Sequence, residues 1–111
     1  MEKRVIFRNW NWNMAGCLYL PDNFDETKRY AALAVCHPGG GVKEQTSKLY
    51  AEGMAKAGFI VLTFDASHQG ESEGEPRLWD NPYERSEDVK CAVDYLTTLP
   101  YVERARIGAI G

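Results

Sequence analysis

The sequence lacks the features that would direct a chain to nucleic acid or to a membrane. Its 111 residues contain 13 Lys and Arg against 16 Asp and Glu, and the basic residues form no stripe. A nucleic-acid partner is therefore not expected. No apolar run is long enough for a signal peptide or a membrane span. We therefore expect a cytoplasmic protein with no membrane partner.

Cysteine and histidine are both scarce. Cys17, Cys36 and Cys91 are odd in number and far apart, so we expect reduced, buried thiols rather than a disulfide framework. His37 and His68 have no clustered cysteines beside them, and neither a metal site nor a cofactor is predicted. Internal repeats and low-complexity tracts are absent as well. A chain of this length is enough for one modest domain and not for two.

The hydrophobic pattern alternates between strand-like and helix-like segments. A hairpin is expected first, from the short strand-like runs on either side of an Asn- and Trp-rich turn, at residues 5–8 and 14–20. Three further apolar runs predict buried strands, at residues 30–38, 58–66 and 106–110. The order β-β-β-α-β-α-β predicts an α/β fold with a mostly parallel sheet after the N-terminal hairpin.

The first predicted helix covers about residues 47–57. Thr46 or Ser47 is suited to cap its free N–H groups, and Gly58 to end it in a left-handed conformation. One stripe of this helix is formed by Tyr50, Met54 and Ala57.

The second predicted helix starts at Asn81 and Pro82, a cap followed by proline in the first turn, and Pro100 closes it. Its apolar stripe is formed by Val89, Ala92, Val93 and Leu96. The acidic residues near its start suit the positive end of the helix dipole; they are Glu84, Glu87 and Asp88.

The stretch CHPGGGVKEQ joins a predicted strand to a predicted helix. Its three glycines let the backbone approach a ligand closely and turn N–H groups toward it. Such a loop suits an anion, either a phosphate or the oxyanion of an acyl-transfer intermediate. A tight turn that binds nothing is the third interpretation.

A nucleotide site gains some support from Asp65, which ends the next strand where a ribose-binding acid would lie. The nucleotide motifs themselves fail. A dinucleotide motif would need glycine in place of Glu44, and a phosphate-binding loop would need glycine at Val42, before Lys43. This interpretation is therefore weaker than the oxyanion interpretation.

Three motifs follow one another along the chain. They are HPGGG at 37–41, DASHQGES at 65–72 and the final segment DYLTTLPYVERARIGAIG. In this order they resemble the His-Gly-Gly loop, the Asp-x-x-Gly-x-Gly-x-Ser motif and the approach to the nucleophile elbow of the α/β-hydrolase superfamily. His68 stands where the first glycine of the second motif is usual. The resemblance covers nearly all 111 residues and is nearest to dienelactone-hydrolase-like and related uncharacterised bacterial hydrolases.

The resemblance implies a partial oxyanion hole in the glycine loop. Backbone N–H groups around Gly39, Gly40 and Gly41 would form half of it, with Gly40 the first choice. His37 would orient the loop rather than act as the base, because the triad histidine of this superfamily comes last in the chain.

The remaining loop residues are given lesser roles. Asp65 is expected to hold its own loop by hydrogen bonds rather than to act as the triad acid, and His68 to be a surface residue. The loop 73–82 is the only local candidate for a pocket wall, through Arg77, Leu78 and Trp79.

The resemblance makes Gly111 the first glycine of the elbow. The Ser or Cys nucleophile, the acid and the base would follow it, and none of them is in this chain. Residues 1–111 are then a single partial domain, the N-terminal part of an α/β-hydrolase fold with strand order 1-2-4-3-5. Its last strand would be an unpaired apolar edge that needs the rest of its own domain or a complementing chain.

The expected function is cleavage of an ester, thioester or related acyl bond of a small-molecule substrate, with the 111-residue chain inactive alone. A non-catalytic fragment or binding module completed by a partner is the alternative hypothesis. A nucleotide-binding α/β domain is the third.

Overall fold

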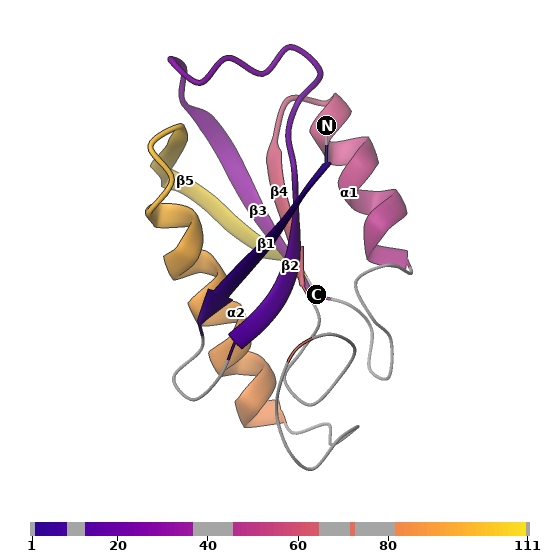
Figure 1. Ribbon diagram of the computed structural model, residues 1–111, viewed down its shortest axis with the longest axis vertical. Helices are drawn as coiled ribbons and strands as arrows, with labels where there is room; N and C mark the ends of the chain where they lie inside the picture. The colour runs from indigo at the N-terminus through magenta and orange to yellow at the C-terminus, as the bar shows by residue number, and fades with distance from the viewer. Residues whose placement is uncertain (1, 9–12, 37–45, 65–71, 73–81, 111) are drawn as a thin grey trace.

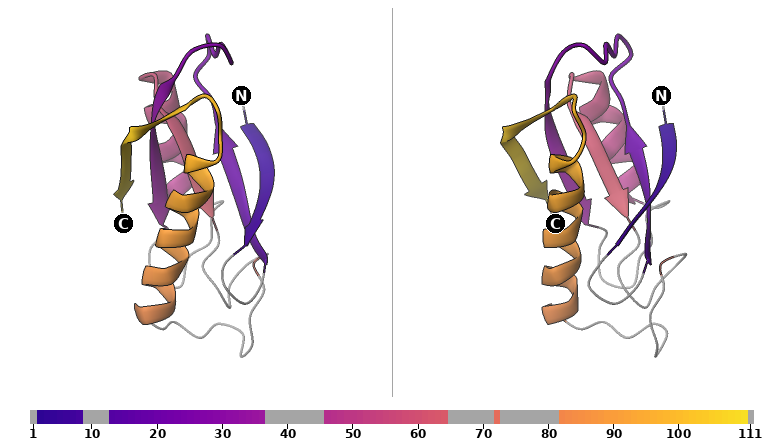
Figure 2. Two further views of the ribbon diagram at one scale, coloured as in Figure 1. Left: turned by 90° about the vertical axis from the view of Figure 1, so that its left-hand side faces the viewer. Right: turned by 60° about the vertical axis from the view of Figure 1, so that its left-hand side comes forward.

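The protein is a five-stranded sheet with one helix on each face (Figures 1 and 2). The computed structural model describes residues 2–8, 13–36, 46–64, 72 and 82–110. The strands are β1 (Glu2–Arg8), β2 (Asn13–Tyr19), β3 (Tyr30–Cys36), β4 (Ile60–Phe64) and β5 (Val102–Ile110), and the helices are α1 (Thr46–Lys56) and α2 (Pro82–Thr97). Neither helix, within these residues, is long and apolar enough to cross a membrane.

The strand order is β1-β2-β4-β3-β5, which confirms the order implied by the resemblance. The hairpin strands β1 and β2 are antiparallel, and β2 is also antiparallel to β4. β3 lies between β4 and β5 and is parallel to both. The predicted hairpin followed by a parallel sheet is therefore confirmed.

The central strand β4 divides the core into two clusters. All five of its residues are buried, and successive side chains point to opposite faces of the sheet. On the α2 face, Leu62 and Phe64 belong to the larger cluster, whose other large members include Phe7, Met14, Leu18, Ile60 and Leu96. On the α1 face, Val61 packs in a smaller cluster with Cys17, Tyr19, Val35, Ala51 and Ala55.

The predicted buried stripe of α1 is wrong. Tyr50 and Ala57 are exposed, and the helix buries Ala51 and Ala55 instead, with Met54 partly buried. Two alanines facing the sheet let the helix axis approach it closely, and larger residues are left to the outer side. The predicted end of the helix is confirmed, since Gly58 has a positive φ of 104°.

The second helix agrees with its predicted pattern. It begins at Pro82, and its stripe of Ala92 and Leu96 is fully buried, with Val89 and Val93 partly buried beside them. The side chains at its first turn lie outside the described part of the chain.

The last strand was predicted too short and too buried. β5 begins at Val102 rather than at residue 106, because alternating charged residues conceal its first half. It pairs only with β3, so its expected edge position is confirmed, but Arg106 and Ala109 are exposed rather than buried.

A close backbone approach joins the hairpin to the rest of the sheet. Gly16 of β2 pairs with Phe64 of β4. A Cβ atom at Gly16 would lie 2.8 Å from the carbonyl oxygen of Thr63 and 3.2 Å from the Cδ1 of Leu62. Only glycine fits at this position without moving β2 away from β4.

We expect Gly16→Ala to lower the free energy of unfolding by about 2 kcal/mol or more, because the new methyl group meets backbone that cannot rotate away. Gly53→Ala is the matched control. Gly53 lies inside α1, and a methyl group added there would have nothing within 4 Å, so the same change should raise stability by about 1 kcal/mol. Urea unfolding measures both; equal effects of the two substitutions would contradict the packing at Gly16.

Candidate functional site

The ends of three neighbouring strands lie in register. Cys36 at the end of β3 pairs with Phe64 at the end of β4, and Val35 pairs with Ile110 at the end of β5. The arrowheads of these strands point to the same end of the molecule in Figure 2. We call this end the carboxyl edge. It is the place at which open α/β sheets bind their ligands.

The connections make β3 the centre of this edge. The chain passes from β3 through α1 to β4 on one side, and then from β4 through α2 to β5 on the other side. The crossover direction therefore reverses at β3, which is the topological condition for a ligand crevice. α1 and α2 cover opposite faces of the sheet (Figure 2).

The electrostatics of this edge favour a negative charge. α1 follows β3, so its N-terminus belongs to the connection that leaves the carboxyl edge. Its first turn contains no acidic side chain, and its last turn contains Lys56. The positive end of the helix dipole is therefore not neutralised by its own residues.

The loop residues predicted for the site lie outside the described residues. This holds for His37, Gly39, Gly40 and Gly41 of the glycine loop and for Gly111. It also holds for the loop residues Asp65 and His68, and for Arg77, Leu78 and Trp79. The roles given to them remain predictions. The structure does place both ends of the segments that contain them.

Buried polar side chains of the described residues are Thr63, Ser72 and Asp88. Thr63 precedes the last residue of β4, and Ser72 belongs to the connection that follows β4. Asp88 lies in the first half of α2, which follows the same connection. Polarity in the core is thus concentrated toward the carboxyl edge, whereas the rest of the core is apolar.

Asp88 was assigned from the sequence to the positive end of the helix dipole, and its burial was not predicted. Its side chain is 0% exposed, and it continues the buried stripe of Ala92 and Leu96 at spacings of four residues. That spacing was visible in the sequence and indicated burial. The acidic character of the residue concealed it, because a carboxylate is rarely buried without a partner.

Ser72 ties the connection after β4 to the hairpin. Its side chain is 1% exposed, and its Oγ accepts a hydrogen bond of 2.9 Å from the N–H of Ala15 in β2. Sequence analysis placed Ser72 in the DASHQGES motif but assigned it no contact. The two residues are 57 positions apart, so no local pattern indicated the bond.

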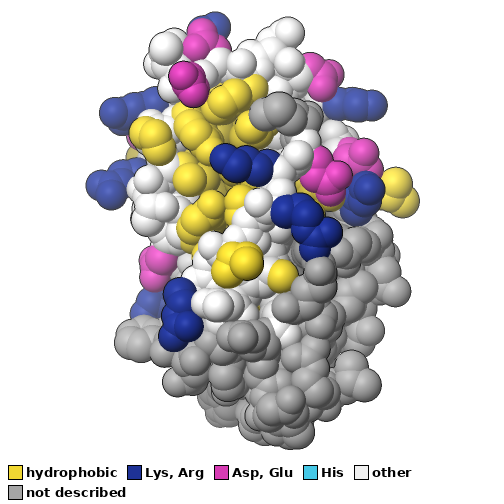
Figure 3. All heavy atoms as spheres, viewed as in Figure 1, with side chains coloured by type: hydrophobic (Ala, Val, Ile, Leu, Met, Phe, Trp, Pro, Cys, Tyr) yellow, Lys and Arg dark blue, Asp and Glu magenta, His cyan; other side chains and the backbone are white. Residues whose placement is uncertain are grey.

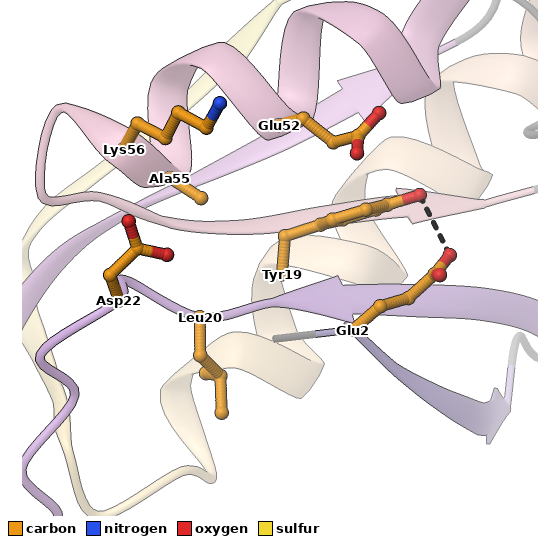
Figure 4. Close-up of a pocket in the computed structure, with 7 residues that line it drawn as sticks. All are labelled: Glu2, Tyr19, Leu20, Asp22, Glu52, Ala55 and Lys56. Carbon is orange, nitrogen blue, oxygen red and sulfur yellow. Dashed lines mark hydrogen bonds between the residues drawn. The ribbon is translucent and has the colours of Figure 1, made fainter.

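A polar cleft lies at the end of the molecule opposite the carboxyl edge. It is lined by Glu2, Tyr19, Leu20, Asp22, Glu52, Ala55 and Lys56 (Figure 4). The hydroxyl of Tyr19 donates a 3.0 Å hydrogen bond to Oε2 of Glu2. Burial, followed by this bond and the charge of Glu2, raises the pKa of the Tyr19 phenol well above its ordinary value. Tyr19 therefore stays protonated and is unsuited to act as a base.

The cysteines that the structure describes, Cys17 and Cys91, form no disulfide. Cys17 is buried as predicted, Cys91 is half-buried, and the side chain of Cys36 lies outside the described part. Burial raises the pKa of the Cys91 thiol, and the nearby charge of Asp88 adds to this effect. Because the thiolate is the reactive form, Cys91 is poorly suited to be a nucleophile. No group of three or more His, Cys, Asp or Glu in the described ranges is placed to hold a metal ion.

Curated relatives match the chain over much or all of its length. Protein YcjY of Escherichia coli K12 is 51% identical over 114 residues, covering 100% of this chain and 37% of YcjY. Thiohydrolase aneE of Aspergillus aculeatus is 39% identical over 80 residues, covering 72% of this chain and 25% of the thiohydrolase. The chain thus spans about a third of the length of YcjY and less of aneE. No family model matches it.

Solved structures show the same fold. Hypothetical protein PA2218 from Pseudomonas aeruginosa superposes with a TM-score of 0.93 at 45% identity, covering 100% of this chain and 35% of that one. The α/β-hydrolase GrgF from Penicillium sp. sh18 gives a TM-score of 0.89 at 22% identity, covering 98% and 36%. The fold of the chain is that of the N-terminal part of α/β-hydrolases, as the sequence motifs implied.

The hydroxyl of Thr63 gives the first prediction for this edge. Its Oγ1 is buried without a hydrogen-bond partner among the residues that the structure describes. Thr63→Val replaces the hydroxyl with a methyl group of similar size, so we expect the free energy of unfolding to rise by about 1 kcal/mol. Thr63→Ser, which keeps the hydroxyl and loses the methyl group, should lower it. A destabilising valine in urea unfolding would show that the hydroxyl is satisfied.

The raised pKa of Tyr19 gives a pH dependence. A phenol whose pKa is higher in the folded than in the unfolded protein contributes stability below pH about 10 and loses it as the pH rises further. In Tyr19→Phe the loss of stability between pH 10 and 12 should therefore be shallower than in the unaltered protein. Tyr50→Phe, at a side chain that is 45% exposed and outside this cleft, is the control. If stability fell equally steeply with pH in both variants, the raised pKa of Tyr19 would be refuted.

Proposed function

Because the chain has the fold of the N-terminal part of α/β-hydrolases, we propose that it contributes one side of the active site of an enzyme that cleaves an ester, thioester or related acyl bond. The relative named as a thiohydrolase supports an acyl substrate of this class. The substrate would be a small molecule. The buried thiol of Cys17, which forms no disulfide, fits a cytoplasmic location.

One observation carries this proposal. β3 and β5 are adjacent and parallel, and their ends are in register, with Val35, the last residue but one of β3, opposite Ile110. Adjacent strands lie about 4.8 Å apart. The chain that carries HPGGG therefore leaves the sheet beside the chain that leads to Gly111. An oxyanion hole and a nucleophile must lie within a few ångströms of one reacting carbonyl, and this pairing supports such proximity.

The glycine loop and the following helix suit the negative charge of the reaction. N–H groups around Gly40, with Gly39 and Gly41, would donate to the oxyanion, and His37 would orient the loop. The positive end of α1, without acidic residues in its first turn, adds a favourable field. Losing one oxyanion donor costs an acyl-transfer enzyme about 3 kcal/mol of transition-state stabilisation.

The other catalytic groups would come from further chain. The nucleophile would be a Ser or Cys two positions after Gly111, with the acid and the base beyond it. The exposed edge of β5, at Arg104, Ala105 and Arg106, would pair with the strands that follow. Residues 1–111 are then a partial domain, completed by the rest of its own domain or by a complementing chain, and inactive alone.

Activity of the longer protein tests this function. We expect it to hydrolyse p-nitrophenyl esters or thioesters. Replacement of the Ser or Cys two positions after Gly111 by alanine should reduce kcat by about a millionfold. Residues 1–111 alone should show no turnover. Any residue other than Ser or Cys at that position would refute the proposal, as would full activity in its alanine variant.

A further inference from the structure

The chain after β4 leaves the sheet and returns to it at nearly the same point. Phe64, the last residue of β4, pairs with Gly16 of β2. Ser72, eight positions later, accepts a hydrogen bond from Ala15, the residue next to Gly16. Both ends of the intervening stretch are therefore fixed against two consecutive residues of one strand.

The bond occupies a defined place in the sheet. The ladder between β2 and β4 runs from Tyr19 to Gly16, so Ala15 lies one residue beyond its end. On its other side Ala15 is opposite Ile6 of β1. The serine oxygen accepts a hydrogen bond from the N–H of Ala15 at this point, just past the last residue pair that the structure describes between β2 and β4. It satisfies a backbone donor that would otherwise need another partner.

The burial of Ser72 shows that this contact is part of the packed structure. The side chain is 1% exposed, and its Oγ bonds to a residue of the hairpin that is 57 positions away. β2 is separated from β3 only by β4, which corresponds to about 10 Å. Ser72 therefore fixes the chain within two strand spacings of the end of β3, from which the proposed oxyanion loop leaves.

We propose that Ser72 is a positioning residue of the carboxyl edge, which fixes by its bond to Ala15 where the chain between β4 and α2 crosses the end of the sheet. The hydroxyl does not touch the substrate. It acts by holding the neighbouring chain, and so the shape of the crevice beside β3, in one place. This inference rests on the proposed acyl-bond hydrolysis for its catalytic consequence. It rests on the structure alone for the contact.

The contact is tested first in the unaltered full-length protein. Ala15 lies beyond the ladder between β2 and β4, so without the serine bond its amide would exchange with solvent rapidly. We expect its hydrogen exchange to be slowed to within about tenfold of that of Cys17 inside the ladder. An Ala15 amide that exchanges as fast as those of the exposed turns overturns the proposal, whatever the variants show.

The catalytic consequence is tested with Ser72→Ala in the same protein. Loss of the bond should speed exchange at Ala15 and protease cleavage within residues 65–71 by about tenfold each. It should also reduce kcat for p-nitrophenyl esters by about 10- to 100-fold, with KM changed much less, well below the melting temperature. Thr98→Ala is the matched control, because its exposed hydroxyl contacts only the Tyr95 carbonyl at the far end of α2.

The outcomes separate the two proposals. A variant that melts at a lower temperature but keeps kcat and KM in its folded form makes Ser72 merely structural and overturns the inference. A full-length protein without hydrolase activity, in which exchange and cleavage still respond to Ser72→Ala, refutes the proposed function and leaves the positioning role supported.

Discussion

The close contact between β2 and β4 is the constraint on which the rest of the structure depends. Gly16 lets the hairpin come so near that a Cβ atom at this position would lie only 2.8 Å from the carbonyl oxygen of Thr63. This approach sets the register of the antiparallel pair, and so places Ala15 beyond the end of β4. The bond to Ser72 and the larger core cluster both follow from that register, since Leu18 lies opposite Leu62 and Met14 belongs to the same cluster.

The two edge strands of the sheet, β1 and β5, differ in their side chains. β1 carries exposed basic residues at Lys3, Arg4 and Arg8, and Figure 3 shows basic side chains spread over the face on which β1 lies, with hydrophobic ones between them. Charged side chains on an edge strand oppose its pairing with another copy. β5 combines Arg104 and Arg106 with a stretch of small and apolar residues at its end. That end adjoins the proposed site.

The sequence predicted most of the fold, because its elements are marked by strong local signals. The apolar run of β4, the left-handed Gly58 and the proline at the start of α2 each act within a few residues. The misjudged features depend on distant partners. The buried face of α1 is set by the sheet below it. The start of β5 is marked by the pairing of Val102 with Tyr30 of β3, before the register between the two strands shifts. The candidate site follows the same division. Its glycine loop was found by motif, whereas the contact of Ser72 spans 57 residues and no periodicity reveals it.

The order in which the strands appear in the chain has a consequence for synthesis on the ribosome. β2 is made early, and its partner strand β4 is made much later. Ser72, which bonds to Ala15 of β2, follows Ala15 by 57 residues. At ordinary translation rates this interval lasts roughly 3 to 11 s. During that time the nascent hairpin can form only its local pairing with β1, and its apolar side chains have no sheet to cover them. The hairpin is therefore made before its partner strand and is among the last segments of this sheet to reach its native surroundings.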